Sequence, residues 1–323
     1  MLYKPTKSFN PKFLFRNKHF NTAYRYYFTK TKINFNRKRI YTQDNDFLDL
    51  DFSTVNSDTV VIAIHGLEGS SNSSYIRTLT SFLNKNKIDA IALNLRNCSG
   101  EPNKLLSSYH SGKSDDLLEV IQHIENNYHY KNIHVVGYSL GGNITLKFMG
   151  EFADKTQVKS AVAVSVPCSL KGSSEAMMQK GNKLYMNNFL KTLKIKSKEK
   201  MERFPDSSLD LNKILQAKNF KDFDDAVTAP TNGFKDAEDY WEKSSCKQFL
   251  KFIKKPSLLI TALDDPFLNE ACYPTKEAND SKHFHILATK YGGHVGFCQS
   301  FNSKNNFWLE NQILSFIKNN NKS

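Results

Sequence analysis

From residue 45 onward, short apolar runs rich in valine, isoleucine and leucine alternate with longer segments whose apolar residues recur at helical spacing. The runs are FLDLDF, TVVIAIHG, DAIALNLR, NIHVVGYS, VKSAVAVSVP, PSLLITALDD and KHFHILAT. The helical spacing is found in residues 75–85, 115–127, 140–152 and 306–318. This alternation predicts an α/β fold class, with βαβ units forming a mostly parallel, twisted sheet covered by helices on both faces.

Residues 169–252 interrupt this pattern, because they contain no strand-like run and carry many lysines and scattered prolines. We expect a helical insertion here that forms a lid over the carboxyl ends of the strands, where ligands bind in open α/β sheets. A chain of 323 residues is long enough for one sizeable core with such an insertion. We therefore divide the chain into an N-terminal arm, residues 1–44, and an α/β domain, residues 45–323, that contains the lid.

The arm is strongly basic: its first 40 residues hold eleven lysines and arginines and no acidic residue, out of a net charge of +13 for the chain. Phenylalanines and tyrosines are interleaved with these cations, a composition that suits an anionic membrane surface or a nucleic-acid backbone. An arm that packs its aromatic residues onto the domain explains the same composition. We favour the packed arm, expect no nucleic-acid partner, and leave peripheral contact with an anionic membrane open.

Other features of the composition indicate a reduced, cytoplasmic protein, with the same membrane contact left open. No apolar run approaches the roughly 20 residues needed to cross a bilayer, and the basic N-terminus lacks the hydrophobic region of a secretory signal. The five cysteines are odd in number, widely spread and without a C-x-x-C pair, which argues against a disulfide framework or a structural zinc site. We expect neither a metal nor another cofactor.

The segment VVGYSLGGN places Ser139 between Gly137 and Gly141, where a buried strand is expected to turn abruptly into a helix. A serine on such a turn is strained with its hydroxyl pushed outward, and the flanking glycines avoid clashes with the neighbouring strand and helix. A chance G-x-S-x-G match in a chain of this length has odds on the order of one in ten. The strand before it and the helix after it make the match specific, so we predict Ser139 as a nucleophile.

A serine nucleophile needs a base, and in this arrangement the partners follow in the order serine, acid, histidine. His294 lies in the loop YGGHVGF after the last strand, whereas the two histidines of KHFHILA alternate within a strand. The acid should end the preceding strand, where LLITALDD offers Asp264 and Asp265. We favour Asp265, because Ala262 occupies the small-residue position three before the acid in the usual pattern of such enzymes. That reason is an analogy, so Asp264 stays open.

The oxyanion that develops during acyl transfer needs backbone N–H donors, one from the residue after the nucleophile and one from the loop after an earlier strand. Leu140 supplies the first donor. We assign the second to Leu67 in IHGLEGSSNS. His65 at the end of that strand is expected to support the loop and not to act as a base.

Several segments together resemble one family, the YheT-like branch of the α/β-hydrolases, which includes eukaryotic abhydrolase-domain lipid esterases. They are HGLEGSSNSSY, LNLRNCSGEPN, SYHSGKSDDL, VVGYSLGGNITLKFMGE, ALDDPF and GGHVGF, in the family's order, and FNPKFLFRNKHFNTAYRYYF resembles its leading segment. The resemblance implies an α/β-hydrolase fold and a serine hydrolase acting on small-molecule or lipid carboxylic esters, with Ser139, Asp265 and His294 as a triad. The usual arginine-glycine of the second segment is Arg96-Asn97 here, which leaves the local turn in doubt.

Two alternatives come from other classes. An acyltransferase would use the same serine, and His110 to Asp115 spells H-x-x-x-x-D, a pattern reported at transferase sites. This is weak support, because the residues belong to the family segment SYHSGKSDDL and are expected to lie far from the site. A non-catalytic binding protein on the same scaffold is expected to have lost a triad residue, and none is missing.

Overall fold

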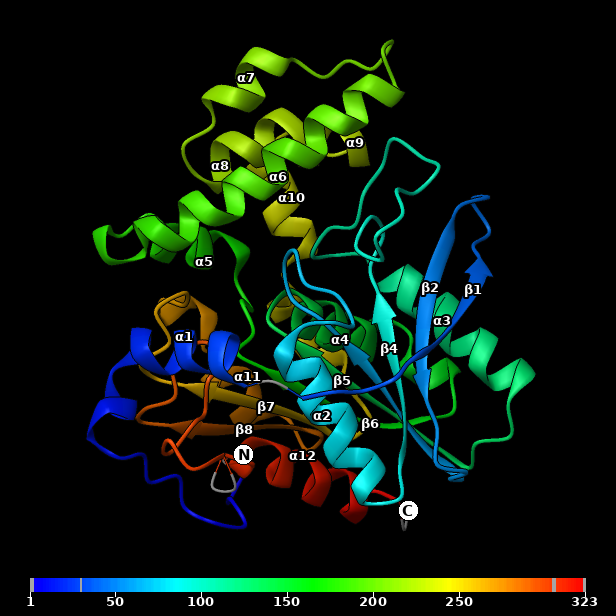
Figure 1. The fold of residues 1–323 in the computed structure, drawn as a ribbon, viewed down its shortest axis with the longest axis vertical. Helices are drawn as coiled ribbons and strands as arrows, with labels where there is room; N and C mark the ends of the chain where they lie inside the picture. The colour runs from blue at the N-terminus through cyan, green and yellow to red at the C-terminus, as the bar shows by residue number, and fades with distance from the viewer. Residues whose placement is uncertain (1–2, 30, 304–305, 322–323) are drawn as a thin grey trace.

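The computed structural model describes residues 3–29, 31–303 and 306–321. An eight-stranded sheet forms its centre, with the strand order β1-β2-β4-β3-β5-β6-β7-β8 (Figure 1). β2 pairs antiparallel with β1 and β4, and the other neighbours are parallel. The strands are β1 (Asn36–Tyr41), β2 (Phe47–Ser53), β3 (Thr59–Ile64), β4 (Asp89–Asn94), β5 (Asn132–Tyr138), β6 (Val158–Val164), β7 (Ser257–Ala262) and β8 (Phe284–Thr289). Every apolar run therefore contains a strand, and the predicted fold class is confirmed.

Helices cover both faces of the sheet because its strands bury both sides. Along β3, Val61 and Ala63 pack with α2 (Ser74–Lys85) and α12 (Trp308–Asn319) on one face. The alternate residues of β3 point to the opposite face. There they share a core with α3 (Ser114–Asn127), α4 (Leu140–Glu151) and α11 (Thr275–Asp280).

β1 lies within the arm and was missed from the sequence, because its residues NRKRIY lack an apolar run. It pairs with β2 through charged side chains: Arg37 contacts Asp51 at 2.7 and 2.8 Å, and Arg39 contacts Asp49 at 2.8 and 2.9 Å. Cross-strand pairs of opposite charge stabilise an antiparallel ladder. The last part of the 1–44 segment is thus built into the sheet.

Residues 169–252 are largely helical; the helices up to Ser244 gather above the sheet in Figure 1, whereas Cys246 and Leu250 belong to the core of the domain. The helices are α5 (Leu170–Met177), α6 (Lys183–Arg203), α7 (Leu211–Gln216), α8 (Phe220–Phe223), a π-helical turn (Asp224–Thr228), α9 (Ala229–Asn232) and α10 (Ala237–Ser244), with short 3-10 helices at Lys180–Asn182 and Cys246–Phe252. The two ends of the insertion meet, because Lys247 N–H donates to Cys168 O at 3.2 Å and Leu170 N–H donates to Ser245 Oγ at 3.0 Å. The insertion also has its own apolar cluster, which includes Leu190, Ile214 and Phe223.

The first part of the arm packs onto the domain through a 3-10 helix, Phe13–Arg16, and α1 (Lys18–Phe28). Arg25 is buried and forms an ion pair with Glu310 of α12. Phe15 is also buried, edge-on to Phe301 at a centroid distance of 5.1 Å. Among the described residues no helix is long and apolar enough to span a bilayer, and all five cysteines are buried and free.

Candidate active site

Ser139 lies between the end of β5 and the start of α4, with φ 53° and ψ −119°. A left-handed φ is strained for a residue with a Cβ. The flanking glycines are needed for space: a Cβ on Gly137 would lie 2.3 Å from Gly141 O, and one on Gly141 would lie 2.4 Å from His65 O. This is the geometry expected of a nucleophile turn.

Three side chains from distant parts of the chain meet here. His294 Nε2 lies 3.0 Å from Ser139 Oγ, and His294 Nδ1 lies 2.9 Å from Asp265 Oδ2 and 3.1 Å from Oδ1. The Asp265 side chain is fully buried, and its Oδ1 also accepts a hydrogen bond from Phe267 N at 2.9 Å. The structure therefore brings together the three residues predicted from the sequence, in the order acid, imidazole, hydroxyl.

Asp264 points to a different partner. Its Oδ1 accepts a hydrogen bond from Gly293 N at 2.9 Å, and burial raises the pKa of its carboxyl group. Ala262 lies against the loop that carries His294, because a Cβ on Gly292 would lie 2.9 Å from the Ala262 Cβ. Asp265, and not Asp264, thus contacts the imidazole.

The loop after β3 runs beside the serine, since a Cβ on Gly66 would lie 3.1 Å from Ser139 Cβ. The N–H groups on either side of Leu67 are occupied: Gly66 donates to Tyr75 OH at 2.9 Å and Glu68 donates to Tyr109 OH at 2.9 Å. Among the hydrogen bonds of the described residues none uses the N–H of Leu67. Of the three consecutive main-chain N–H groups, only that of Leu67 is thus available to a ligand.

His65 supports this loop from below. Its Nδ1 donates to Gly66 O at 2.7 Å and its Nε2 accepts from Leu95 N at 3.1 Å. The ring is fully buried, and desolvation lowers the pKa of His65 to about 4, so it is neutral at pH 7. Both ring nitrogens are engaged, which leaves neither available as a base.

Asn97, which stands where the family pattern has glycine, adopts a left-handed φ of 62°. Asparagine tolerates this conformation better than most residues. Its N–H donates to Asn103 Oδ1 at 2.6 Å, and its own Oδ1 accepts from Asn103 N at 2.8 Å. The reciprocal pair stabilises the turn that the sequence left in doubt.

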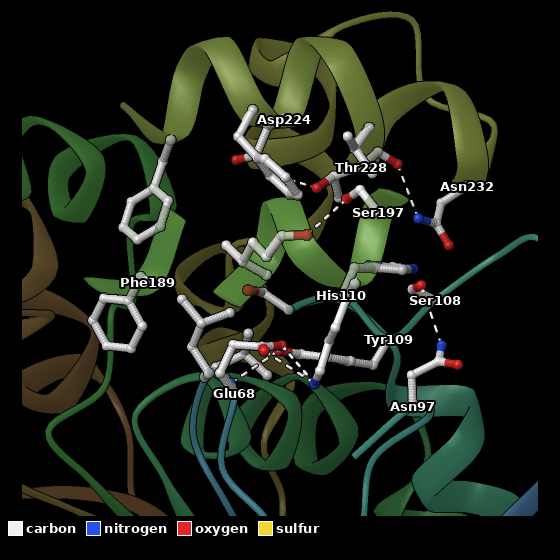
Figure 2. Close-up of a pocket in the computed structure, with 18 of the residues that line it drawn as sticks. Glu68, Asn97, Ser108, Tyr109, His110, Phe189, Ser197, Asp224, Thr228 and Asn232 are labelled. Carbon is white, nitrogen blue, oxygen red and sulfur yellow. Dashed lines mark hydrogen bonds and ion pairs between the residues drawn. The ribbon is translucent and has the colours of Figure 1, made fainter. Parts of the chain in front are cut away.

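A cavity of about 360 Å³ lies between the insertion and the sheet, with Ser139, Leu140 and His294 in its wall. Its apolar lining comes largely from the insertion and includes Met177, Phe189, Leu193, Phe220, Phe223, Val227 and Trp241. Polar side chains line another part: Figure 2 shows Ser108, Thr228 and Asn232 across the cavity from Phe189. The cavity is therefore amphipathic, as small-molecule sites commonly are.

His110 lines the same cavity, which corrects the expectation that it lies far from the site. Its Nδ1 accepts from Gly112 N at 3.1 Å, and its ring packs edge-on to Phe234 and Tyr240. Burial, and then the nearby Lys113 charge, lower the pKa of His110 to about 3. Asp115 pairs with Lys113 at 2.7 Å, so the H-x-x-x-x-D residues do not form a hydrogen-bonded pair.

Several residues of the site could not be found from the sequence. Tyr75 and Tyr109, which orient the loop around Leu67, lie in the family segments but carry no signal of this contact. Lys196 of α6 reaches Glu68 at 3.0 Å and so joins the insertion to this loop. Nothing distinguishes Lys196 from the other lysines of α6. Among the described residues no group of histidine, cysteine and acidic side chains could hold a metal ion.

Comparison with known proteins agrees with the fold. The sequence profile of the α/β hydrolase fold family matches residues 59–297. The YheT protein of Escherichia coli (strain K12), named as an esterase, is 32% identical over 87% of this chain and 84% of its own length. Phospholipase ABHD3 of Mus musculus is 24% identical over 90% of this chain and 73% of its own.

Among solved structures, the Pyrococcus furiosus esterase Pf2001 superposes with a TM-score of 0.60 at 19% identity, covering 88% of this chain and 92% of its own. At that identity the likeness concerns the fold alone. The match to the family profile and the identity to YheT show family membership as well as the fold. The resemblance inferred from the sequence motifs is thus confirmed. The chain belongs to the α/β-hydrolase family, in its YheT-like branch.

Proposed function

We propose that this protein is a serine hydrolase that cleaves carboxylic esters through an acyl-enzyme intermediate. The observation that carries the proposal is the chain of hydrogen bonds from Asp265 through His294 to Ser139, with its distances of 2.9 and 3.0 Å. A hydroxyl, an imidazole and a buried carboxylate in this order are the parts of an activated serine nucleophile. The esterase and phospholipase names of its relatives support the same chemistry.

In the proposed first half-reaction, Ser139 Oγ attacks the ester carbonyl carbon while His294 Nε2 takes the hydroxyl proton. Asp265 holds Nδ1 protonated and stabilises the imidazolium. The N–H groups of Leu67 and Leu140 donate to the carbonyl oxygen as it becomes negative. The tetrahedral intermediate collapses, the alcohol leaves with the proton from His294, and the acyl group stays on Ser139.

In the second half-reaction, His294 removes a proton from water, and the resulting hydroxide attacks the acyl carbon. Collapse of this intermediate releases the carboxylic acid and returns the proton to Ser139 Oγ. If an alcohol takes the place of water, the same steps transfer the acyl group, which is the acyltransferase alternative. His110 and Asp115, which bond to other partners and not to each other, give that alternative no special support.

The lining of the cavity favours an amphiphilic ester. Aromatic and aliphatic side chains, such as Phe189 and Phe223, suit an acyl chain, and hydrogen-bonding side chains, such as Thr228 and Asn232, suit a polar alcohol part. A volume of about 360 Å³ is at the lower end of the range for small-molecule sites. We therefore propose short- or medium-chain acyl esters, with lipid esters among them.

A series of p-nitrophenyl esters from acetate to palmitate tests this proposal with purified protein. We expect kcat/KM to reach its maximum at a short or medium chain and to fall for palmitate. Addition of glycerol, with products separated by chromatography, distinguishes hydrolysis from acyl transfer. Lack of turnover across the whole series would contradict ester hydrolysis as the activity.

We also propose that α1 holds the enzyme at an anionic membrane surface. Among the arm cations that the structure describes, Arg25, Arg37 and Arg39 form ion pairs within the fold, so fewer charges serve a membrane than the composition suggested. Lys12, Arg16 and Lys18, however, are exposed, and so are four aromatic side chains of the same segment, which are 62–83% exposed: Phe13, and Tyr26, Tyr27 and Phe28 at the end of α1. Cations mixed with interfacial aromatic residues are typical of membrane-surface segments.

Sedimentation with liposomes tests the membrane proposal. The protein should bind anionic liposomes at low salt, be released as salt rises, and ignore neutral ones, because the attraction decays within a Debye length of roughly 8 Å at physiological salt. Tyr26→Ser/Tyr27→Ser and Lys12→Gln/Lys18→Gln should weaken binding. Lys4→Gln/Lys7→Gln is the matched control and should leave binding unchanged, because the segment that carries these two lysines runs along β8 and α12 and not along α1. No binding of the wild-type protein at low salt would refute the proposal.

A further inference from the structure

The loop that carries His294 holds an unusual backbone conformation. Val295 and Phe297 have φ angles of 60° and 48°, although neither is a glycine, and Gly292 and Gly293 are also in the positive-φ region. Such conformations persist only where the surroundings determine them strongly. Part of the support comes from the domain, since Ser165 Oγ accepts from Val295 N at 3.0 Å.

Further support comes from α1, at the other end of the chain. Thr22 Oγ1 accepts a hydrogen bond from His294 N at 2.8 Å. The same hydroxyl donates its single proton to Lys18 O at 2.7 Å, so its lone pairs are left to face His294. The main-chain N–H group of the proposed catalytic base is thus bound by a side chain of the arm.

Asn21 provides a second contact, beyond His294. Its amide nitrogen donates to Cys298 O at 2.9 Å and to Phe15 O at 2.7 Å, and its Oδ1 accepts from Cys298 N at 2.9 Å. The side chain is fully buried. Both main-chain groups of Cys298 are therefore bound by one arm residue, which limits the movement of the loop at its far end.

The loop also fits against α1 with no space for larger residues. A Cβ on Gly293 would lie 2.4 Å from Lys18 O, and one on Gly296 would lie 2.4 Å from Asn21 Oδ1. α1 is itself fixed to the domain, because Arg25 is paired with Glu310 and its carbonyl oxygen accepts from Ser74 Oγ at 2.9 Å. The helix can therefore act as a rigid support.

From these contacts we infer that α1 of the N-terminal arm is a part of the catalytic apparatus, with Thr22 as a positioning residue for His294. The inference rests on the proposed function, in which His294 is the base. Thr22 touches no reacting atom, and its effect passes through the main chain of His294. Loss of the Thr22 hydroxyl should therefore lower kcat and leave substrate binding unchanged, because a small misplacement of a catalytic group is enough to slow the chemical step.

The test is Thr22→Val, which removes the hydroxyl with little change in shape. We expect kcat on a soluble p-nitrophenyl ester to fall about 10- to 100-fold, with KM unchanged within twofold and a matching fall in the rate of fluorophosphonate labelling. Thr22→Ser keeps the hydroxyl and should restore kcat. Should valine disturb folding, Thr22→Ala is judged by the same criterion.

Asn17→Ala is the matched control for helix stability. Asn17 caps α1 by accepting from Phe20 N at 3.0 Å, and among the hydrogen bonds of the described residues its side chain makes none to the loop. Its loss should therefore lower the melting temperature and leave kcat unchanged. An equal loss of kcat in Asn17→Ala and Thr22→Val would overturn the inference, as would a kcat of Thr22→Val within twofold of wild type. If the wild-type protein hydrolyses no ester, the proposed function fails instead.

Discussion

Asp264 and Asp265 are adjacent in the chain but make different contacts. Asp265 bonds to His294 Nδ1, whereas Asp264 accepts from the main chain of Gly293. The first contact controls which imidazole nitrogen carries the proton, and the second only supports the loop. The two carboxyl groups should therefore differ greatly in their importance for turnover.

We predict that Asp265→Asn lowers kcat about 10⁴-fold, because an amide in this place favours the wrong imidazole tautomer. Asp264→Asn should lower kcat far less, since the amide oxygen of asparagine can still accept from Gly293 N. Steady-state kinetics of both variants on one ester checks the ranking. The reverse ranking would move the role of the acid to Asp264.

Much of the candidate site could be expected from the sequence at this scale, because each candidate residue follows a strand in a recognisable motif. It could not decide between the two aspartates on physical grounds, since side-chain direction depends on the turn after β7. Thr22 was beyond reach for another reason: it is 272 residues from His294, and no local pattern indicates a contact over that separation.

At the scale of elements, the least expected feature is the π-helical turn Asp224–Thr228 between α8 and α9. Such turns occur often at functional sites, and this one places Asp224 in the cavity wall. Asp224 is partly buried and accepts from Thr228 Oγ1 at 2.6 Å and from Trp241 Nε1 at 2.8 Å. Desolvation outweighs these two hydrogen bonds and raises the pKa of Asp224 to about 7.

This pKa can be measured, because Trp241 reports directly on Asp224. We predict that the intrinsic fluorescence of the protein titrates with a midpoint near pH 7, since the charge on the carboxyl group bonded to the indole appears as the pH rises. Asp224→Asn should remove this transition and leave the signal of Trp308, the other tryptophan, unchanged. A midpoint near 4 in the wild-type protein would show that the carboxyl group is not desolvated as described.

The elements themselves followed from hydrophobic periodicity wherever both faces of a strand are buried, as in β3 and β5. β1 was not expected from the sequence because it has no apolar run: its residues Arg37 and Arg39 pair instead with aspartates of β2. The helices of residues 169–252 were expected as a group. Their individual bounds were not, because the polar surface of the insertion weakens the periodic signal.

At the scale of the whole molecule, the arm and the domain form one packed body. The buried pair of Arg25 and Glu310 connects α1 to α12, close to the two ends of the chain. Removal of one partner would leave a buried charge without compensation. Such a loss destabilises proteins by about 3–5 kcal/mol.

We therefore predict that Arg25→Ala lowers the free energy of unfolding by about 3–5 kcal/mol, measured by urea denaturation at pH 7. The double variant Arg25→Met/Glu310→Leu should recover most of this loss, because apolar side chains of similar volume can replace a buried ion pair. A change below about 1 kcal/mol in Arg25→Ala, the range of an exposed pair, would show that the arm is not held by this contact.

The central claim is that Ser139 is an activated nucleophile, and covalent labelling measures this most directly. A fluorescent fluorophosphonate should label the wild-type protein at one site, identified as Ser139 by mass spectrometry of the peptide. Ser139→Ala should keep the circular dichroism spectrum and melting temperature of the wild type, lose labelling, and hydrolyse esters at least about 10⁴-fold more slowly, since triad residues act as a unit. Labelling or ester turnover that persists in Ser139→Ala at the wild-type level would contradict the account.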